Sequence, residues 1–77
     1  MDDAATLVIF RRFGLTGREA EILQAVARGH SNAEIGMQLG IRPGTVKKHL
    51  ERVYSKLDVN TRLAAALKVS AERYRSN

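Results

Sequence analysis

Residues 31–57, SNAEIGMQLGIRPGTVKKHLERVYSKL, contain two helical patterns separated by a short break. Ser31 and Glu34 have the three-residue spacing of a capping box at the start of a helix. Gly40 is suited to the left-handed conformation at which many helices end. Pro43 follows at the first position of the next helix, where its missing N–H costs nothing.

The second of these patterns is an amphipathic helix with a basic outer face. Its apolar residues recur at i, i+4, i+7 and i+11, and they form one stripe: Val46, Leu50, Val53 and Leu57. Lys47, Lys48, Glu51 and Arg52 fall outside that stripe. A short helix, a turn with glycine and a longer basic helix form the sequence pattern of a helix-turn-helix. The alternative is an ordinary helical hairpin in a small core.

Length and composition limit the chain to one small domain. It has 77 residues, of which 44% are hydrophobic, and a domain of this size buries only about 60% of its unfolded surface. Dimerisation is therefore a plausible source of further burial. The absence of cysteine excludes disulfides and thiolate metal sites.

The charge of the chain favours a polyanionic partner. The formal net charge is +5 and the isoelectric point is near 10.3. Five cations lie between Arg42 and Lys56, with Glu51 as the one acid among them. The longest apolar cluster near the N-terminus, Leu7–Phe10, is too short for a membrane span or a signal peptide. We therefore expect a soluble cytoplasmic protein that makes no membrane contact.

Two further helices complete the expected domain, residues 15–74. The first begins with a second capping box, Thr16 and Glu19, and ends at Gly29. The last follows the start signal Asn60 and runs from Thr61 to about residue 74, leaving 75–77 as a tail. The predicted fold class is all-α, a compact four-helix domain with a central helix-turn-helix.

Residues 1–14 form an N-terminal extension that the sequence leaves open. Asp2 or Asp3 is placed to cap a short helix that ends at Gly14, with Leu7, Phe10 and Phe13 on its inner face. A strand of four residues is an alternative, but it has no partner elsewhere in the chain. A third alternative is a linker from a preceding domain.

The last helix is apolar on more than one side. One stripe, which packs on the domain, comprises Arg62, Ala65, Ala66 and Val69. The other comprises Leu63, Ala64, Leu67, Ala71 and Tyr74. A second stripe indicates either deeper burial or a partner helix, and in so small a domain we favour a dimer interface.

These patterns together resemble the LuxR-type DNA-binding domain of bacterial transcription regulators, also called the GerE or NarL/FixJ type. The resemblance covers about residues 14–71 without a gap. It rests on Leu15-Thr16, Arg18-Glu19, Glu21, Leu23, Gly29, Ser31-Asn32, Glu34-Ile35, Leu39, Ile41, Thr45-Val46-Lys47, His49, Lys56-Leu57, Val59, Arg62 and Ala65. It implies a homodimer, formed through the fourth helix, on inverted-repeat DNA, with the helix at about residues 43–57 in the major groove. Relatives of this type, response regulators among them, often carry an upstream sensor or receiver domain.

Four positions depart from the family pattern. Gly36 replaces the usual alanine, which weakens its helix by about 1 kcal/mol. Arg42 replaces the usual serine cap of the recognition helix, and Gly44 adds backbone freedom in the first turn. Asp58 replaces a glycine, a change that aspartate tolerates because it enters left-handed conformations more readily than most residues. Together these departures predict modest stability.

The expected base contacts lie on the outer face of the recognition helix. Lys47 and Lys48 are placed to reach guanine O6 and N7 or nearby phosphates, and the resemblance supports Lys47 in particular. Glu51 would accept from a cytosine amino group or pair with Lys47 at i,i+4. Without the resemblance, the alternative to DNA contact is that these lysines form an ordinary solvent-exposed helix face.

The expected phosphate contacts surround that face and form a second set: Ser31, Asn32, Thr45, His49, Arg52 and Lys56. The resemblance implies phosphate contacts by Thr45, Ser31 and Asn32, which also have structural roles as caps or turn residues. His49 is equally compatible with a half-buried spacer. We expect Arg18 with Glu19 to form a structural ion pair with Arg62 or a neighbour.

An enzyme is not expected. The histidines, His30 and His49, have no acidic partners at catalytic spacing, and no glycine-rich phosphate loop is present. We expect no metal and no cofactor. The expected partners are double-stranded DNA, a second copy of the chain and RNA polymerase. The rival hypotheses are a sigma-factor-like promoter-binding region and a small helical adaptor that binds another protein.

Overall fold

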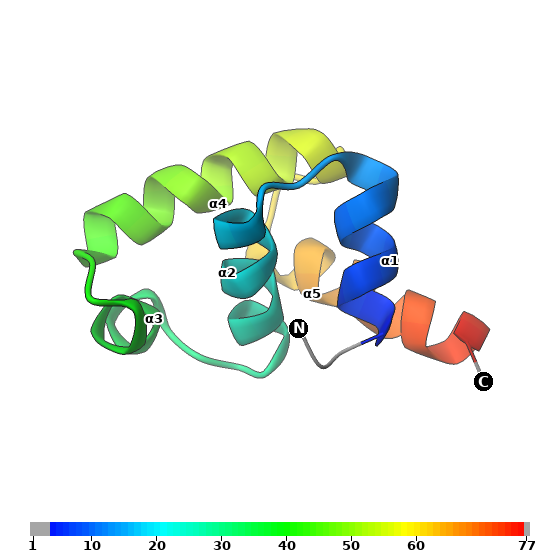
Figure 1. Ribbon diagram of the computed structural model, residues 1–77, viewed down its shortest axis with the longest axis horizontal. Coiled ribbons are helices and arrows are strands. Elements are labelled where there is room, and N and C mark those ends of the chain that lie inside the picture. Colours follow the sequence, from blue (N-terminus) through cyan, green and yellow to red (C-terminus); the bar gives the residue numbers. More distant parts are fainter. Residues whose placement is uncertain (1–3, 77) are drawn as a thin grey trace.

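Residues 4–76 are described by a computed structural model, and they form five helices without a strand among them (Figure 1). The helices in chain order are α1 Ala4–Phe13, α2 Gly17–Ala27, α3 Asn32–Leu39, α4 Pro43–Leu57 and α5 Arg62–Ser76. α2 contacts α1, α4 and α5, whereas α3 packs on α4 and α1 packs on α5. In Figure 1, α4 follows one edge of the molecule, with α3 at one end and α1 at the other. The predicted all-α class is confirmed.

Both predicted capping boxes are formed. The Thr16 hydroxyl accepts from the Glu19 N–H at 3.1 Å, and the Glu19 carboxylate accepts from the Thr16 N–H at 2.9 Å. At the start of α3, the corresponding distances between Ser31 and Glu34 are 3.1 and 2.8 Å. Hydrogen bonds from the Ser31 N–H and hydroxyl lower the pKa of the exposed Glu34 carboxyl. The caps fix where α2 and α3 begin.

The turn between α3 and α4 comes unusually close to α3. Gly40 adopts the left-handed conformation, with φ of 69°, and the Ile41 N–H donates to the Gly36 carbonyl at 2.9 Å. A Cβ atom at position 36 would lie 2.5 Å from the Ile41 carbonyl oxygen. Such a contact is far too short for any real side chain, so the close approach requires glycine at this position. This contact accounts for the glycine that stands here in place of the usual alanine.

The two ends of α4 confirm two departures seen in the sequence. Arg42 occupies the N-cap position and makes no side-chain capping hydrogen bond there. Asp58 ends the helix in the left-handed conformation, with φ of 57°. A residue other than glycine in this conformation costs of order 1 kcal/mol. Both ends of α4 are therefore less stable than the ends of a helix with a serine N-cap and a glycine at its C-terminus.

Two apolar clusters form the core, and α4 contributes to both. One cluster joins α1, α2, the second half of α4 and α5, and its members are Ala5, Ile9, Leu15, Ala20, Leu23, Val53, Leu57, Ala65 and Val69. The other joins α2, α3 and the first half of α4, and its members are Ile22, Val26, Ile35, Val46 and Leu50. The predicted stripe of α4 is thus buried along its whole length. α4 is held by one face only, and its opposite face stays exposed.

The N-terminal segment, left open by the sequence, forms helix α1 over its described part and belongs to the core. Its buried residues are Ala5, Thr6 and Ile9. The predicted inner face of Leu7, Phe10 and Phe13 was therefore misplaced, because the face that packs inward is centred on Ile9. Phe10 and Phe13 only pack against the cluster while half-buried. Four consecutive apolar residues give no preferred face, and contact with α5 and α2 selects Ile9. The capping role of Asp2 or Asp3 lies outside the described residues.

Helix α5 starts and ends slightly later than expected. The Thr61 hydroxyl accepts from the Ala64 N–H at 3.1 Å, so Thr61, and not Asn60, supplies the start. The helix continues to Ser76, beyond the predicted end at Tyr74. Within the described residues, no helix has the length and apolar character needed to cross a bilayer.

Candidate nucleic-acid interface

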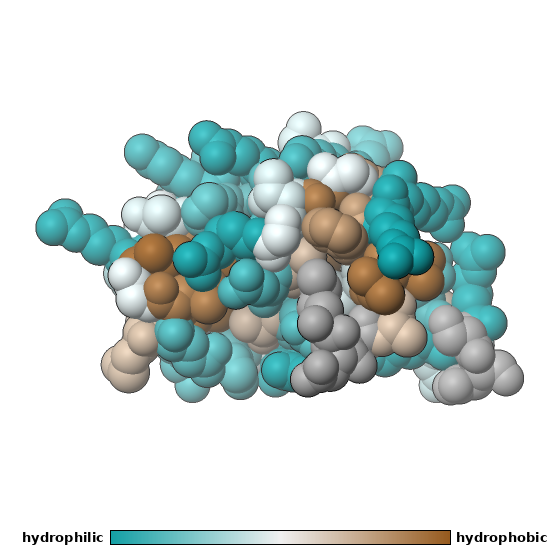
Figure 2. All heavy atoms as spheres, viewed as in Figure 1, coloured by the Kyte–Doolittle hydropathy of each residue, from teal (hydrophilic) through white to brown (hydrophobic). Residues whose placement is uncertain are grey.

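The exposed face of α4 carries the residues expected to contact DNA. Lys47, Lys48, Glu51 and Arg52 are all exposed, while their neighbours in the apolar stripe are buried. Hydrophilic side chains accordingly follow the α4 edge of the molecule in the space-filling view (Figure 2). The structure thus brings the predicted base-contacting residues together on one convex, solvent-facing surface.

The first turn of α4 has no side-chain cap, and the Gly44 N–H is its one backbone donor without a partner among the described residues. The Thr45 and Val46 N–H groups donate to the Arg42 carbonyl at 3.0 and 3.1 Å. Pro43 has no N–H, and no side chain caps the helix. The first turn of a helix carries partial positive charge, which favours an anion such as a phosphate. The exposed hydroxyl of Thr45 lies in this same turn.

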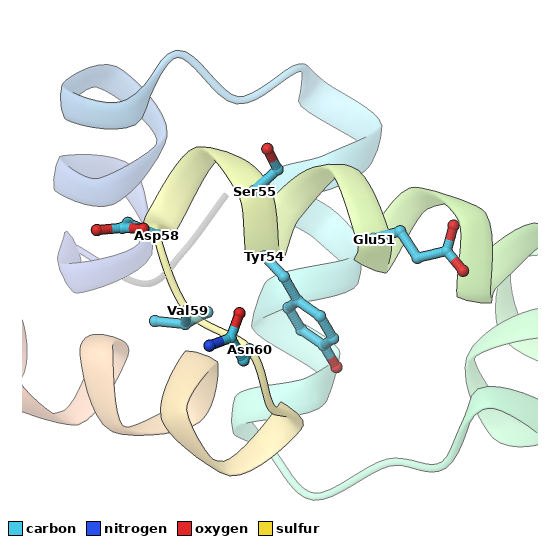
Figure 3. A pocket seen from close by; sticks show the side chains of 6 residues that line it. All are labelled: Glu51, Tyr54, Ser55, Asp58, Val59 and Asn60. Carbon is cyan, nitrogen blue, oxygen red and sulfur yellow. The ribbon is translucent and has the colours of Figure 1, made fainter.

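Glu51 does not restrain Lys47. Within residues 4–76, no ion pair joins the two side chains, so the i,i+4 interaction considered for Glu51 is not formed. Figure 3 shows the Glu51 carboxylate directed away from the ring of Tyr54. The acid is therefore exposed on the α4 surface together with its lysine neighbours.

An open hollow of about 430 Å³ lies beside the second half of α4 (Figure 3). It is lined by Glu51, Tyr54, Ser55, Asp58, Val59 and Asn60. Two of these residues are acids and none is a cation, so a phosphate would be repelled there. The hollow is not suited to a nucleic-acid backbone, and the convex face of α4 remains the candidate surface.

Two residues expected at phosphates differ in their exposure. Arg52 is exposed on the outer face of α4, whereas His49 is half-buried. Among residues 4–76, no hydrogen bond holds the His49 ring, so it is not fixed as the backbone-bonded spacer that the sequence also allowed. Both side chains adjoin the surface formed by Lys47 and Lys48.

The start of α3 is tied to α5. The Arg62 guanidinium donates through Nη1 to Asn32 Oδ1 at 2.6 Å and through Nη2 to the His30 carbonyl. Of the two alternatives predicted for Arg18 and Glu19, the ion pair with Arg62 is not formed, and each residue pairs with a different partner. Arg18 instead lies 3.6 Å from Glu21, one turn along its own helix.

Lys56, expected at a phosphate, is engaged elsewhere. Its Nζ lies 2.7 Å from Glu19 Oε1 and 3.1 Å from the Gly14 carbonyl oxygen. The Glu19 side chain is only 3% exposed. Burial raises the pKa of Glu19, but hydrogen bonds from Lys56 and Thr16 together with the Lys56 charge outweigh it and leave that pKa below its ordinary value. Lys56 thus fastens the end of α4 to the turn between α1 and α2.

A second basic surface lies where α1 meets the C-terminal half of α5. It surrounds a hollow of about 210 Å³ whose lining includes Arg12, Lys68 and Arg75. Arg12 and Arg75 lie 3.5 and 3.4 Å from Glu72, and Arg12 and Lys68 lie over the Phe13 ring. These cations are already paired within the molecule, whereas among the described residues Lys47, Lys48 and Arg52 of α4 have no ion-pair partner. Sequence patterns did not predict this surface, because its two halves are far apart in the chain.

The second apolar stripe of α5 is exposed. Leu63, Leu67 and Tyr74 are 68%, 57% and 84% exposed, Ala71 is exposed and Ala64 is half-buried. The opposite stripe packs inward through Ala65 and Val69, which are fully buried. Among the described residues, nothing therefore covers the three large side chains of the outer stripe.

A short helix, a glycine turn and a longer basic helix held by one face define a helix-turn-helix DNA-binding domain. Residues 14–69 match the family described as bacterial regulatory proteins, luxR family. The chain belongs to this family, as its sequence predicted, and its helix-turn-helix is the DNA-binding domain of a transcription regulator. The expectation that it is not an enzyme agrees with this membership.

Individual relatives agree with the family. YhjB of Escherichia coli strain K12, named as an HTH-type transcriptional regulator, is 51% identical over 53 residues, 69% of this chain and 26% of YhjB. The transcriptional regulatory protein LiaR of Bacillus subtilis is 51% identical over 53 residues, 69% of this chain and 25% of LiaR. The response regulator protein VraR of Staphylococcus aureus is 45% identical over the same length. The chain spans about a quarter of these relatives. No solved structure gave a significant match.

Proposed function

We propose that this domain binds double-stranded DNA in a sequence-specific manner, with α4 as the recognition helix in the major groove. The observation that carries the proposal is the division of α4 into a buried stripe and an exposed basic face. An α-helix fits the major groove of B-DNA, where each base pair presents a distinct pattern of donors and acceptors. The proposal includes a cytoplasmic location, with the protein associated with the nucleoid while it is bound to DNA.

Lys47, Lys48 and Glu51 are the proposed base contacts. Their exposure on the outer face of α4 supports this role. Lys47 and Lys48 lie in the N-terminal part of the helix, the part that reaches base edges in helix-turn-helix complexes. The lysines would donate to guanine, and Glu51 would accept from a cytosine amino group. The unpaired Glu51 carboxylate would also disfavour bases that offer only acceptors at that position.

The proposed phosphate contacts lie around this base-reading surface, and they are Ser31, Asn32, Thr45, His49 and Arg52. The exposed hydroxyl of Thr45 and the uncapped first turn of α4 support a phosphate at the start of that helix. We leave Lys56 out of the set, because its ammonium group is held by Glu19 and the Gly14 carbonyl.

A homodimer formed through α5, on an inverted repeat, is the proposed assembly. The outer stripe of Leu63, Ala64, Leu67, Ala71 and Tyr74 supports it, because three large side chains in this stripe are more than half exposed. Leu67→Asp should weaken self-association in sedimentation experiments and leave the monomer helical. If the sedimentation of this variant equals that of the parent, the interface lies elsewhere. Contact with RNA polymerase stays a prediction.

The experiment that tests the function compares Lys47→Ala with the parent by fluorescence anisotropy. The probes are a duplex selected from a random pool and an unselected duplex of the same length. Loss of a base contact should cost about 1–3 kcal/mol on the selected duplex and much less on the other. An equal loss on both would make Lys47 a phosphate contact. A folded parent that binds neither duplex at low salt would refute the function, and the adaptor hypothesis would then be pursued through the outer stripe of α5.

A further inference from the structure

Arg62, in the first turn of α5, bridges to the segment that leads into α3. Its guanidinium donates to Asn32 Oδ1 at 2.6 Å and to the His30 carbonyl. These acceptors are 30 and 32 residues away in the chain. Arg62 is half-buried, so water competes less for these hydrogen bonds than it would at an open surface.

The bridge decides which way the Asn32 amide points. A guanidinium group only donates hydrogen bonds, so the amide atom that faces Arg62 must be the oxygen. The amide nitrogen therefore points away from Arg62, and within the described residues it has no partner. Asn32 is also the first residue of α3, where backbone N–H groups lack acceptors within the helix. The bridge thus leaves the Asn32 side-chain amide donor unpaired at the start of α3.

A second contact restrains the same segment from the other side. The His30 ring nitrogen Nδ1 and the Gln38 side-chain nitrogen Nε2 lie 3.1 Å apart. His30 is therefore held by α5 through its carbonyl and by the last turn of α3 through its ring. The residues that precede α3 are fixed at two points, so the start of α3 has a defined orientation relative to α5.

We propose that Arg62 is a positioning residue that presents the Asn32 amide to a DNA backbone phosphate without touching DNA itself. This inference rests on the proposed function and explains how one of its phosphate contacts is oriented. It also links that contact to the docking of α5, the helix that carries the exposed outer stripe. A change in how α5 packs would then alter DNA affinity through Arg62.

The test uses a double-mutant cycle with Arg62→Gln and Asn32→Ala, measured by anisotropy on the selected duplex. Each variant should weaken binding by about tenfold, as expected for a lost hydrogen bond to a charged group. The double variant should bind no more weakly than either single variant, because both remove the same contact. Arg11→Gln is the matched control, since it removes the same charge from an exposed site on α1 and should cost much less affinity.

Salt dependence separates positioning from direct contact. If Arg62 acts only through Asn32, the slope of log affinity against log salt should be equal in Arg62→Gln and in the Arg11→Gln control. A direct phosphate contact by Arg62 would lower the slope by about 0.9 relative to that control. That result, or losses in the cycle that simply add, would overturn the proposal.

Asn32→Asp keeps the test decisive if Arg62→Gln does not fold. The aspartate retains an acceptor for Arg62 but removes the amide donor, so it should fold and bind DNA at least tenfold more weakly. Binding of Asn32→Asp equal to the parent would overturn the positioning role, and the function would stand if Lys47→Ala still weakened binding. Absence of DNA binding by the folded parent would instead refute the proposed function itself.

Discussion

Replacing Lys56 by methionine should destabilise the domain without removing a DNA contact. The change leaves the Glu19 carboxylate, whose side chain is 3% exposed, without the ammonium group 2.7 Å away. Breaking a fully buried ion pair costs about 3–5 kcal/mol, whereas an exposed pair contributes about 0–1 kcal/mol. The Lys56 side chain is 35% exposed, so we expect an intermediate loss of about 2 kcal/mol. For a domain of this size, that loss lowers Tm by about 8–16 °C.

The matched control is Arg52→Met, four residues earlier on the exposed face of the same helix. Thermal unfolding followed by circular dichroism gives the stability of both variants, and anisotropy against salt gives their DNA contacts. Lys56→Met should unfold at a lower temperature and keep the salt slope of the parent. Arg52→Met should keep Tm within a few degrees, the usual range for a surface substitution, and lower the slope by about 0.9. A stable Lys56→Met variant with a reduced slope would refute the structural role of Lys56.

Three further predictions follow from the caps and the buried carboxylate. Since the pKa of Glu19 lies below its ordinary value of 4.5 when folded, the unfolded chain takes up the proton first, and stability should fall as pH drops below about 4.5 towards the folded pKa. In urea titrations at pH 7 and pH 3.5, Glu19→Gln should therefore lose less stability than the parent, and equal losses would contradict this. Asp58→Gly should raise the free energy of unfolding by about 0.5–1 kcal/mol, since it removes left-handed strain and a negative charge at a helix C-terminus. Asp58→Ala should not raise it, because alanine keeps the strain. Equal Tm values for the two variants would show that position 58 is not strained. Arg42→Ser should add the missing cap and about 1 kcal/mol of stability, and an unchanged Tm would mean that the helix start is already satisfied.

Local signals explain how much of the fold could be predicted from the sequence. Each capping box lies within four consecutive residues, and the stripe of α4 repeats within one helix, so neither depends on the rest of the chain. Gly40 and Asp58 adopt their left-handed conformations for equally local reasons. The exposure of Lys47 follows directly from its position relative to the buried stripe.

Contacts between distant residues explain what the sequence could not supply. Lys56 was assigned to a phosphate, but its partner Glu19 lies 37 residues earlier, and no pattern within α4 reveals that pairing. The bridge from Arg62 to Asn32 was missed for the same reason. In α1, a run of four apolar residues left the buried face undetermined until packing against α5 selected Ile9.

Contact between the outer face of α4 and duplex DNA can be mapped residue by residue by nuclear magnetic resonance. The selected duplex is titrated into isotopically labelled protein, and shifts of backbone amide signals are followed residue by residue. We expect the largest shifts around Thr45, Lys47 and Lys48, with a second group at the start of α3. Shifts concentrated instead around Arg12 and Lys68, on the basic surface between α1 and α5, would contradict this expectation.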